Sequence, residues 1–201
     1  MMFWCVVVAV SVWLYALSVL KRIAWRAGFI VVGVVGVFFL IILLCNDQLT
    51  HWLMQISTWG TGLIGSLTGA YETVPSLGIV HIISGHSAVN LFVTFECSAY
   101  IELAAYFSLA LFFPFFNSNR QRWQLIILGM LFIYLSNVIR LSVTALIVRY
   151  CGPDSLVWAH VIMGRLIFYA LSITLYFYVF TRSQVLNTLT GKFGFDRGAK
   201  V

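Results

Sequence analysis

The sequence predicts an all-α protein, a polytopic bundle of membrane helices. Of its 201 residues, 62% are hydrophobic and only 9% are charged, whereas soluble domains carry about 25% charged residues. Several apolar runs reach the roughly 18 to 20 residues that a helix needs to cross the hydrocarbon core. Because a helix satisfies its backbone hydrogen bonds internally, it is the structure expected for such runs.

Basic residues flank the apolar runs and predict the orientation of the chain. Nine of the twelve lie in three short segments: Lys21, Arg22 and Arg26; Arg120 and Arg122; Arg182, Lys192, Arg197 and Lys200. The positive-inside rule assigns such segments to the cytoplasm, with the N-terminus outside and the C-terminus inside. Anionic lipid head groups are then the expected counter-charge for a net charge of +6, and a nucleic-acid partner has little support.

Five spans follow from this orientation. They cover residues 2–20, 27–45, 99–116, 124–148 and 158–181. The first run has no charged residues before it and no small-residue cleavage site after it, so we expect a retained span rather than a removed signal peptide. The third ends at Pro114, where polar residues mark an exit from the bilayer. Residues 1–181 are predicted to form one membrane-embedded domain and residues 182–201 a basic cytoplasmic tail.

Residues 48–95 are apolar overall but carry several polar side chains: His51, Gln55, His81, His86 and Asn90. We expect one or two interfacial or re-entrant helices here, or a pair of additional spans. A pair would place Glu72 and Pro75 in a cytoplasmic turn without Lys or Arg, which argues mildly against it. In either case Cys97 is predicted to lie at the outer membrane face, because two extra crossings return the chain to the same side.

Three polar side chains from separate segments are predicted to meet at that face. Cys97 begins the third span, Arg140 lies about 17 residues into the fourth, and His160 begins the fifth. A neighbouring cation lowers a thiol pKa to about 3.5 to 7.5, so we expect His160 to activate Cys97 and to act as general acid. Arg140, which stays protonated, suits an oxyanion or a substrate carboxylate. Asn137 is expected to orient Arg140 or to donate to the same oxyanion, and Gly164 shares a helix face with His160.

Glu96 and Glu102 flank the cysteine and are assigned a structural role. They are expected to pair with Arg140, Arg149 or Arg165, because two uncompensated carboxylates would activate a thiolate poorly. Glutamates six residues apart do not share a helix face, so a catalytic carboxylate dyad has little geometric support.

A metal site is the competing interpretation. Its ligands would be His81, His86 and His160, with Cys97 or either glutamate. The five-residue spacing of "HIISGH" fits neither a helical HExxH pair nor a CxxC-type clip, so zinc is weakly indicated. No glycine-rich phosphate loop, GxSxG elbow or dinucleotide fingerprint is present, and no cofactor is predicted.

The other cysteines leave two interpretations open. Cys45 and Cys151 both fall near the outer face, where disulfides persist, so they form a bridge or remain two free thiols. Cys5 lies in an apolar helix, where a cysteine is usually a small buried hydrophobe.

The order of these motifs resembles the exosortase/archaeosortase family of multipass membrane cysteine enzymes. The shared features are "ECS" at the head of a span, "NVIR" in the next span and a histidine heading the last one, and they cover roughly residues 75–181. The stretch "SGHSAVNLFVTFECSAYIEL" looks most like the Gram-positive exosortase G branch. The resemblance implies Cys97 as nucleophile with Arg140 and His160 as essential partners. Many members have Cys-Ser-Gly-Ile, whereas this chain has Ala99 and Tyr100 at the last two positions.

The resemblance also implies a substrate. Members recognise secreted proteins that end in a short motif, a hydrophobic helix and a basic tail, cut them near the outer face, and pass the new C-terminus to an acceptor. The leading hypothesis is therefore an intramembrane cysteine protease/transpeptidase that works through a thioester acyl-enzyme, with an unknown acceptor. The alternatives are a non-catalytic membrane scaffold for surface-polymer export and a metal-dependent membrane hydrolase.

Overall fold

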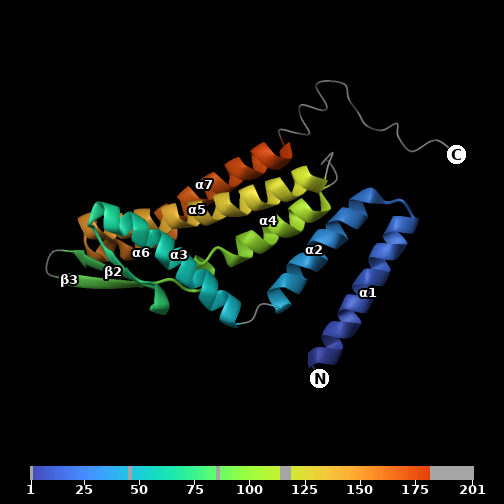
Figure 1. Ribbon diagram of the computed structural model, residues 1–201, viewed down its shortest axis with the longest axis horizontal. Helices are drawn as coiled ribbons and strands as arrows, with labels where there is room; N and C mark the ends of the chain where they lie inside the picture. Colours follow the sequence, from blue (N-terminus) through green and yellow to red (C-terminus); the bar gives the residue numbers. More distant parts are fainter. Residues whose placement is uncertain (1, 45–46, 85–86, 114–118, 182–201) are drawn as a thin grey trace.

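A bundle of helices with a small antiparallel sheet at one end makes up the protein (Figure 1). The computed structural model describes residues 2–44, 47–84, 87–113 and 119–181. The elements in chain order are α1 (Met2–Arg22), α2 (Arg26–Leu44), α3 (Asp47–Thr68), β1 (Glu72–Val74), η1 (Pro75–Leu77), β2 (Ile79–Ser84), β3 (Ser87–Phe92), η2 (Phe95–Cys97), α4 (Tyr100–Phe112), α5 (Asn119–Cys151), η3 (Pro153–Ser155), α6 (Leu156–Trp158), η4 (Ala159–Gly164), α7 (Arg165–Tyr176) and η5 (Phe177–Thr181). The expected basic tail, 182–201, lies outside the described residues.

The prediction of five spans is not supported, although each predicted span contains a helix. In the described part of the chain, three helical segments are long and apolar enough to cross a membrane: Arg26–Leu43, Arg120–Cys151 and Pro153–Thr181. Helix α4 has 13 residues, which is about 20 Å at 1.5 Å per residue, whereas the hydrocarbon core is about 30 Å thick. Residues 114–116, the end of the predicted third span, lie outside the described residues.

Helix α3 exposes apolar side chains and buries polar ones. Trp59 and Leu63 are exposed, while Ser57, Thr58 and Thr61 are almost completely buried. A helix on the surface of a soluble protein has the opposite arrangement. The pattern fits a helix with an apolar environment on its outer side and a polar cluster on its inner side.

The prediction of helices throughout 48–95 was wrong for its second half, which forms the three-stranded sheet β1-β2-β3. Strands β2 and β3 pair antiparallel, with Val80 opposite Leu91 and His81 opposite Asn90. Val80 and Leu91 are buried, whereas the His81 and Asn90 side chains lie on the other face, joined at 2.6 Å. This alternation with period two is the signal for a half-buried strand. The overall apolarity of the segment obscured it.

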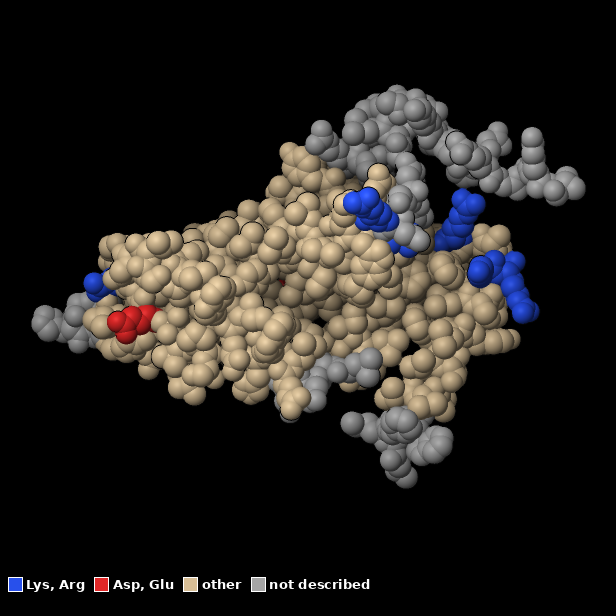
Figure 2. Space-filling view, viewed as in Figure 1, with Lys and Arg blue, Asp and Glu red and all other residues tan. Residues whose placement is uncertain are grey.

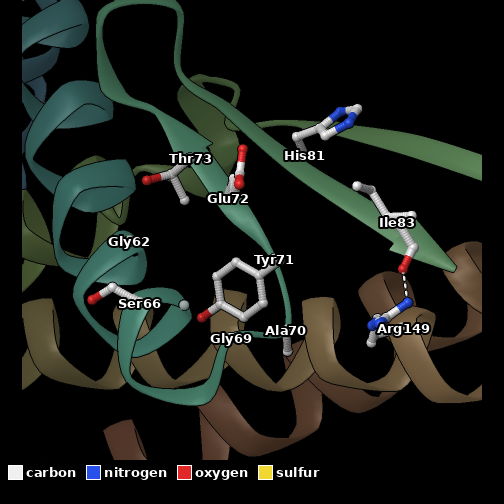
Figure 3. Close-up of a pocket in the computed structure, with 11 residues that line it drawn as sticks. Gly62, Ser66, Gly69, Ala70, Tyr71, Glu72, Thr73, His81, Ile83 and Arg149 are labelled. Atoms are coloured by element: carbon white, nitrogen blue, oxygen red, sulfur yellow. Dashed lines mark hydrogen bonds between the residues drawn. The ribbon is translucent and has the colours of Figure 1, made fainter.

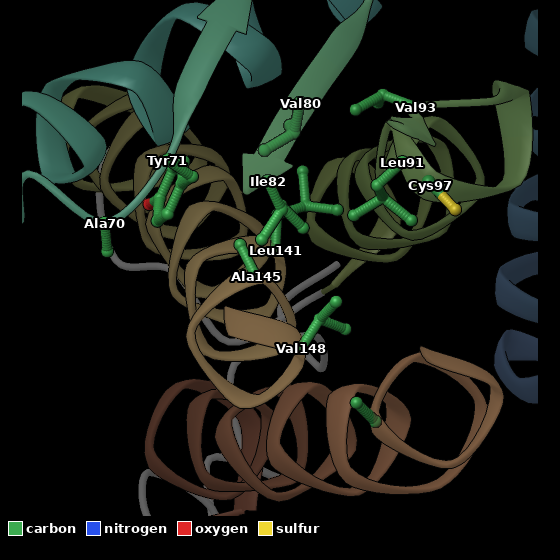
Figure 4. Close-up of a cluster of buried hydrophobic side chains, with 11 residues drawn as sticks. Ala70, Tyr71, Val80, Ile82, Leu91, Val93, Cys97, Leu141, Ala145 and Val148 are labelled. Atoms are coloured by element: carbon green, nitrogen blue, oxygen red, sulfur yellow. The ribbon is translucent and has the colours of Figure 1, made fainter. Parts of the chain in front are cut away.

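The sheet packs its apolar face onto the C-terminal half of α5 (Figure 4). Val80 and Ile82 of β2 join Leu141, Ala145 and Val148 of α5 in one buried cluster. Cys97 belongs to the same cluster. The sheet therefore determines where the chain leading to Cys97 meets α5.

Lysine and arginine side chains gather at the end of the bundle away from the sheet (Figure 2). Helix α1 ends there with Lys21 and Arg22, α2 begins with Arg26, and α5 begins with a turn that contains Arg120 and Arg122. The sheet lies at the opposite end of the molecule from these basic residues (Figure 1).

Candidate active site

Cys97 is held by a short connection between β3 and α4. The Val93 N–H donates to the Gly78 carbonyl at 2.8 Å and prolongs the β2–β3 pairing by one residue. Thr94 is extended, and the Cys97 N–H then donates to the Thr94 carbonyl at 2.9 Å, closing the 3₁₀ turn η2. Because the sheet and a hydrogen-bonded turn both constrain this segment, the Cys97 thiol has a defined position, with 5% of the residue exposed.

The turn after Cys97 uses a left-handed backbone conformation. Ala99 has φ 59° and ψ 19°, immediately before α4 begins at Tyr100. For a residue with a Cβ this region costs about 1 to 2 kcal/mol. Sequence analysis identified Ala99 as a departure where relatives often have glycine. The structure gives that position a physical requirement, because glycine adopts a positive φ without penalty.

His160 approaches the thiol from the last helical segment. It is the second residue of η4, a π-helical stretch between α6 and α7. Its Nε2 atom lies 3.3 Å from Cys97 Sγ. A π-helical insertion shifts the register of the side chains that follow it, and such insertions frequently occur at functional sites. The buried His160 Nδ1 atom has no hydrogen-bond partner among the described residues.

Arg140 projects from α5 beside the same thiol. It is only 6% exposed, and its guanidinium carbon lies 5.3 Å from the centre of the Phe168 ring. The buried Nε atom has no hydrogen-bond partner among the described residues. A cation this buried normally faces a partner or a wet cavity. Gly164 packs against it, since a Cβ at Gly164 would lie 3.3 Å from Arg140 Cγ.

Asn137 contacts the cysteine backbone. It is fully buried, and its Nδ2 atom donates to the Cys97 carbonyl at 2.9 Å and to Ser57 Oγ at 3.4 Å. The sequence led us to expect that Asn137 would contact Arg140 or an oxyanion. The structure instead places it where it holds the Cys97 peptide group, and it ties α3, η2 and α5 together.

The environment of Cys97 favours its thiolate form. Burial raises the pKa of the thiol, but hydrogen bonds from His160 and Thr94 and the charges of His160 and Arg140 lower it. The net result is a pKa of about 7, below the ordinary value of 9.0. Thr94 Oγ1 donates to Cys97 Sγ at 3.5 Å. A purely structural buried cysteine would show the opposite shift.

The pairing of Glu96 and Glu102 with Arg140, Arg149 or Arg165 stays a prediction, because the Glu96 side chain lies outside the described residues. Arg140 lies over Phe168 beside the thiol, Arg149 donates through Nη1 to the Ile83 carbonyl, and Arg165 is exposed. Glu102 lies half-buried in the first turn of α4. Arg140 contacts an aromatic ring and Arg149 a carbonyl, and a pattern of charges along the sequence reveals neither contact.

The metal and disulfide interpretations gain no support from the described residues. Within them, no group of three or more His, Cys, Asp and Glu side chains is arranged to hold a metal ion. His81 bonds to Asn90, and His86 lies outside the described residues. Cys151 is a free, exposed thiol, and Cys45 lies outside the described residues.

A cavity of about 590 Å³ lies on the other side of the sheet, between α3, β1 and the end of α5 (Figure 3). Glu72, His81 and Arg149 line it. Cys97 does not, and in Figure 4 the core residues Ile82 and Leu141 lie between Tyr71 on the cavity side and Cys97. The cavity is therefore separate from the cysteine site.

The site contains residues that sequence reasoning did not assign. Thr94, Ser57 and Phe168 contact Cys97, Asn137 and Arg140 respectively. Thr94 lies three residues before the cysteine, and Ser57 is one of several small polar residues in an otherwise apolar helix. The Ser57 contact joins α3 to α5, which only the fold brings together, and a threonine three residues before a cysteine does not by itself indicate a hydrogen bond.

The fold and the site together define a helical membrane protein with a buried cysteine–histidine pair and an arginine at one end of its bundle. The chain belongs to the transmembrane exosortase family: the family model described as Transmembrane exosortase (Exosortase_EpsH) matches residues 1–178. No curated protein and no solved structure matches the chain.

Proposed function

We propose that the protein is an intramembrane cysteine protease/transpeptidase that cleaves the C-terminal sorting signal of a secreted protein. The observation that carries the proposal is the 3.3 Å approach of Cys97 Sγ to His160 Nε2 beside a buried arginine. Membership of the exosortase family supports the activity class. The stretch around Cys97 favours the Gram-positive exosortase G branch, and the basic residues at the opposite end favour a site on the extracytoplasmic side.

The proposed reaction begins with the Cys97 thiolate. Its proton has passed to His160 Nε2, and the sulfur attacks the carbonyl carbon of the scissile peptide. Arg140 donates hydrogen bonds to the oxyanion that forms, from a position shielded from water where such bonds are most effective. His160 returns the proton to the leaving amine as the C–N bond breaks. The thioester on Cys97 then passes its acyl group to water or to an acceptor nucleophile.

Two neighbours hold the nucleophile for this reaction. Asn137 holds the Cys97 carbonyl, and Thr94 stabilises the thiolate by a hydrogen bond. The unpaired Nε atom of Arg140 and the unpaired Nδ1 atom of His160 are buried donors or acceptors available to a substrate.

The decisive experiment traps the acyl-enzyme. Protein purified from its native cells is quenched in acid, digested and analysed by mass spectrometry for a hydroxylamine-sensitive adduct on Cys97. We expect a peptide attached to Cys97, no adduct on Cys151, and no adduct in Cys97→Ala, while Cys151→Ala retains it. A scaffold role predicts instead that iodoacetamide alkylates Cys97 no faster than the exposed Cys151, and that result would remove the basis of the proposal.

A further inference from the structure

The strand that leads to Cys97 lies at the edge of its sheet. The strand order is β1-β2-β3, and in the described part of the chain no strand lies beyond β3. Five residues after β3 ends at Phe92, the chain reaches Cys97. An edge strand presents a row of backbone donors and acceptors to any extended chain that comes beside it.

The pairing with β2 determines which backbone groups face that edge. Gly78 and Val93 form a hydrogen-bonded pair, because the Val93 N–H donates to the Gly78 carbonyl. Hydrogen-bonded and non-hydrogen-bonded pairs alternate along an antiparallel ladder. Asn90 and Phe92 therefore belong to non-hydrogen-bonded pairs with His81 and Ile79. Their N–H and C=O groups point away from β2, toward the outer edge of β3.

The opposite edge of the sheet is covered. Helix α3 lies along β1, with Thr73 beside Gly62, and Arg149 donates to the Ile83 carbonyl beyond the end of β1 (Figure 3). On the β3 side the residues that flank the edge, Asn90, Phe92 and Thr94, are all exposed. Phe92 is 59% exposed. Among the described residues, no strand pairs with the edge that continues into the candidate nucleophile.

We propose that the substrate binds by strand addition to β3, and this rests on the proposed function. An extended peptide would pair with the outward backbone groups of Asn90 and Phe92, and its side chains would alternate between the face that carries Phe92 and the core side. The strand β3 runs from the far end of the sheet toward the helical bundle (Figure 1). A substrate that runs from the outside toward its own membrane helix takes the same direction. The added strand is therefore parallel to β3 and delivers its scissile carbonyl at Cys97.

The test compares two electrophiles with the same reactive group. N-acetyl-tetraalanyl chloromethyl ketone carries an extended backbone, and chloroacetone does not. In both, the Cys97 sulfur forms a C–S bond and chloride leaves. We expect the peptidyl probe to alkylate Cys97 of the wild-type protein about tenfold faster than chloroacetone does, because only the peptidyl probe can form backbone hydrogen bonds with the edge of β3.

Proline and alanine variants separate backbone pairing from side-chain contact. Phe92→Pro and Asn90→Pro remove N–H groups that do not bond to β2, and an edge strand tolerates proline at such positions. Each substitution should abolish the rate advantage of the peptidyl probe. Phe92→Ala and Asn90→Ala keep the N–H groups and should retain it. All four variants should react with chloroacetone at the wild-type rate, which verifies the fold around Cys97.

Each outcome bears on one proposal or the other. An equal rate for the two probes in the wild-type protein, or an advantage that survives both proline substitutions, would overturn strand addition while leaving the nucleophile intact. Loss of the advantage in the alanine variants as well would overturn it in favour of a side-chain contact. A Cys97 that reacts with chloroacetone no faster than Cys151 does would contradict the proposed function itself.

Discussion

The α1–α2 hairpin and the end of the molecule that carries Cys97 follow opposite rules of burial. In the apolar segment of α2, only 11% of the residues are buried, compared with 50% in α5. Phe39 of α2 is 56% exposed, whereas Asn137 and Arg140 of α5 are among the most buried residues. In a lipid environment outward apolar side chains cost nothing, so burial marks the places where polar groups find partners. Asn137 and Arg140, two of the buried polar residues, belong to the candidate site.

The backbone is also more regular in the α1–α2 hairpin than around Cys97. The α1–α2 hairpin consists of two long helices joined by a turn, and Trp13 Nε1 of α1 donates to the Val32 carbonyl of α2 at 2.9 Å. Around Cys97 a 3₁₀ turn and a π-helix occur together. Such departures are retained where the surrounding structure holds them in place, often at functional sites. The following predictions test whether this contrast reflects function.

Arg140→Leu is expected to have the largest effect. It should lower the rate of substrate processing about 10²- to 10³-fold, the usual loss for one oxyanion donor, and raise the pKa of the Cys97 thiol by removing a positive charge. Arg140→Lys keeps the positive charge, so it should change the pKa of the Cys97 thiol little but still lower the rate of substrate processing. Arg26→Leu, at the start of α2, is the control and should change neither. Processing is measured as the turnover of the substrate that the acyl-enzyme experiment identifies. The pKa of the Cys97 thiol is measured from its alkylation rate at a series of pH values. An Arg140→Leu variant that processes substrate at the wild-type rate would exclude the oxyanion role.

Gly164→Ala should lower processing about five- to tenfold, the scale of a modest overpacking cost. The new Cβ would lie 3.0 Å from Thr144 Oγ1 and 3.3 Å from Arg140 Cγ, so it should displace the arginine. Adding Thr144→Ala makes room and should restore most of the rate. Gly36→Ala in α2, where a Cβ would overlap the Trp13 ring, should reduce thermal stability without altering Cys97 reactivity. If the double variant Gly164→Ala/Thr144→Ala does not recover the rate of processing, the loss does not arise from crowding of Thr144 and Arg140.

Alkylation of Cys97 by iodoacetamide should rise with pH and reach half its maximum near pH 7. The alkylation rate rises with pH because the reactive thiolate predominates above the lowered pKa of about 7. Thr94→Val removes the hydroxyl donor and should move the midpoint upward by about half a pH unit. Thr94→Ser should leave it unchanged. A wild-type midpoint near 9 would show that His160 and Thr94 do not stabilise the thiolate.

The smallest effect concerns two alanines with positive φ, one in each region. Ala24 lies in the α1–α2 turn with φ 58°, and Ala99 follows Cys97 with φ 59°. Ala24→Gly should stabilise the fold by about 1 kcal/mol, since it relieves strain at an exposed position. Ala99→Gly should be close to neutral, because it also removes a methyl group that is 1% exposed. Thermal unfolding in detergent measures both, and a clear loss of stability in Ala24→Gly would contradict the strain argument.

Much of the site could be predicted from the sequence, and the reasons are chemical. Arg140 stands out because a charge in an apolar run is costly, and Cys97 and His160 begin apolar runs at the same predicted depth. The sheet could not be recognised as easily, because the alternating residues of β2 and β3 are apolar enough to resemble a membrane segment. Thr94 and Ser57 carried no signal, since hydroxyls are common in both loops and apolar helices.

The sequence by itself determined that this is a helical membrane protein, which end of it is basic, and which three residues are candidates for chemistry. Those properties depend on composition and on local order along the chain, and they can be read residue by residue. Only the tertiary structure decided that Asn137 holds the Cys97 carbonyl, that Ala99 must adopt a left-handed turn, and that β3 presents an open edge leading to the thiol. Each of these depends on contacts between segments distant in sequence, because a hydrogen bond or a free strand edge exists only once the neighbouring elements are in place.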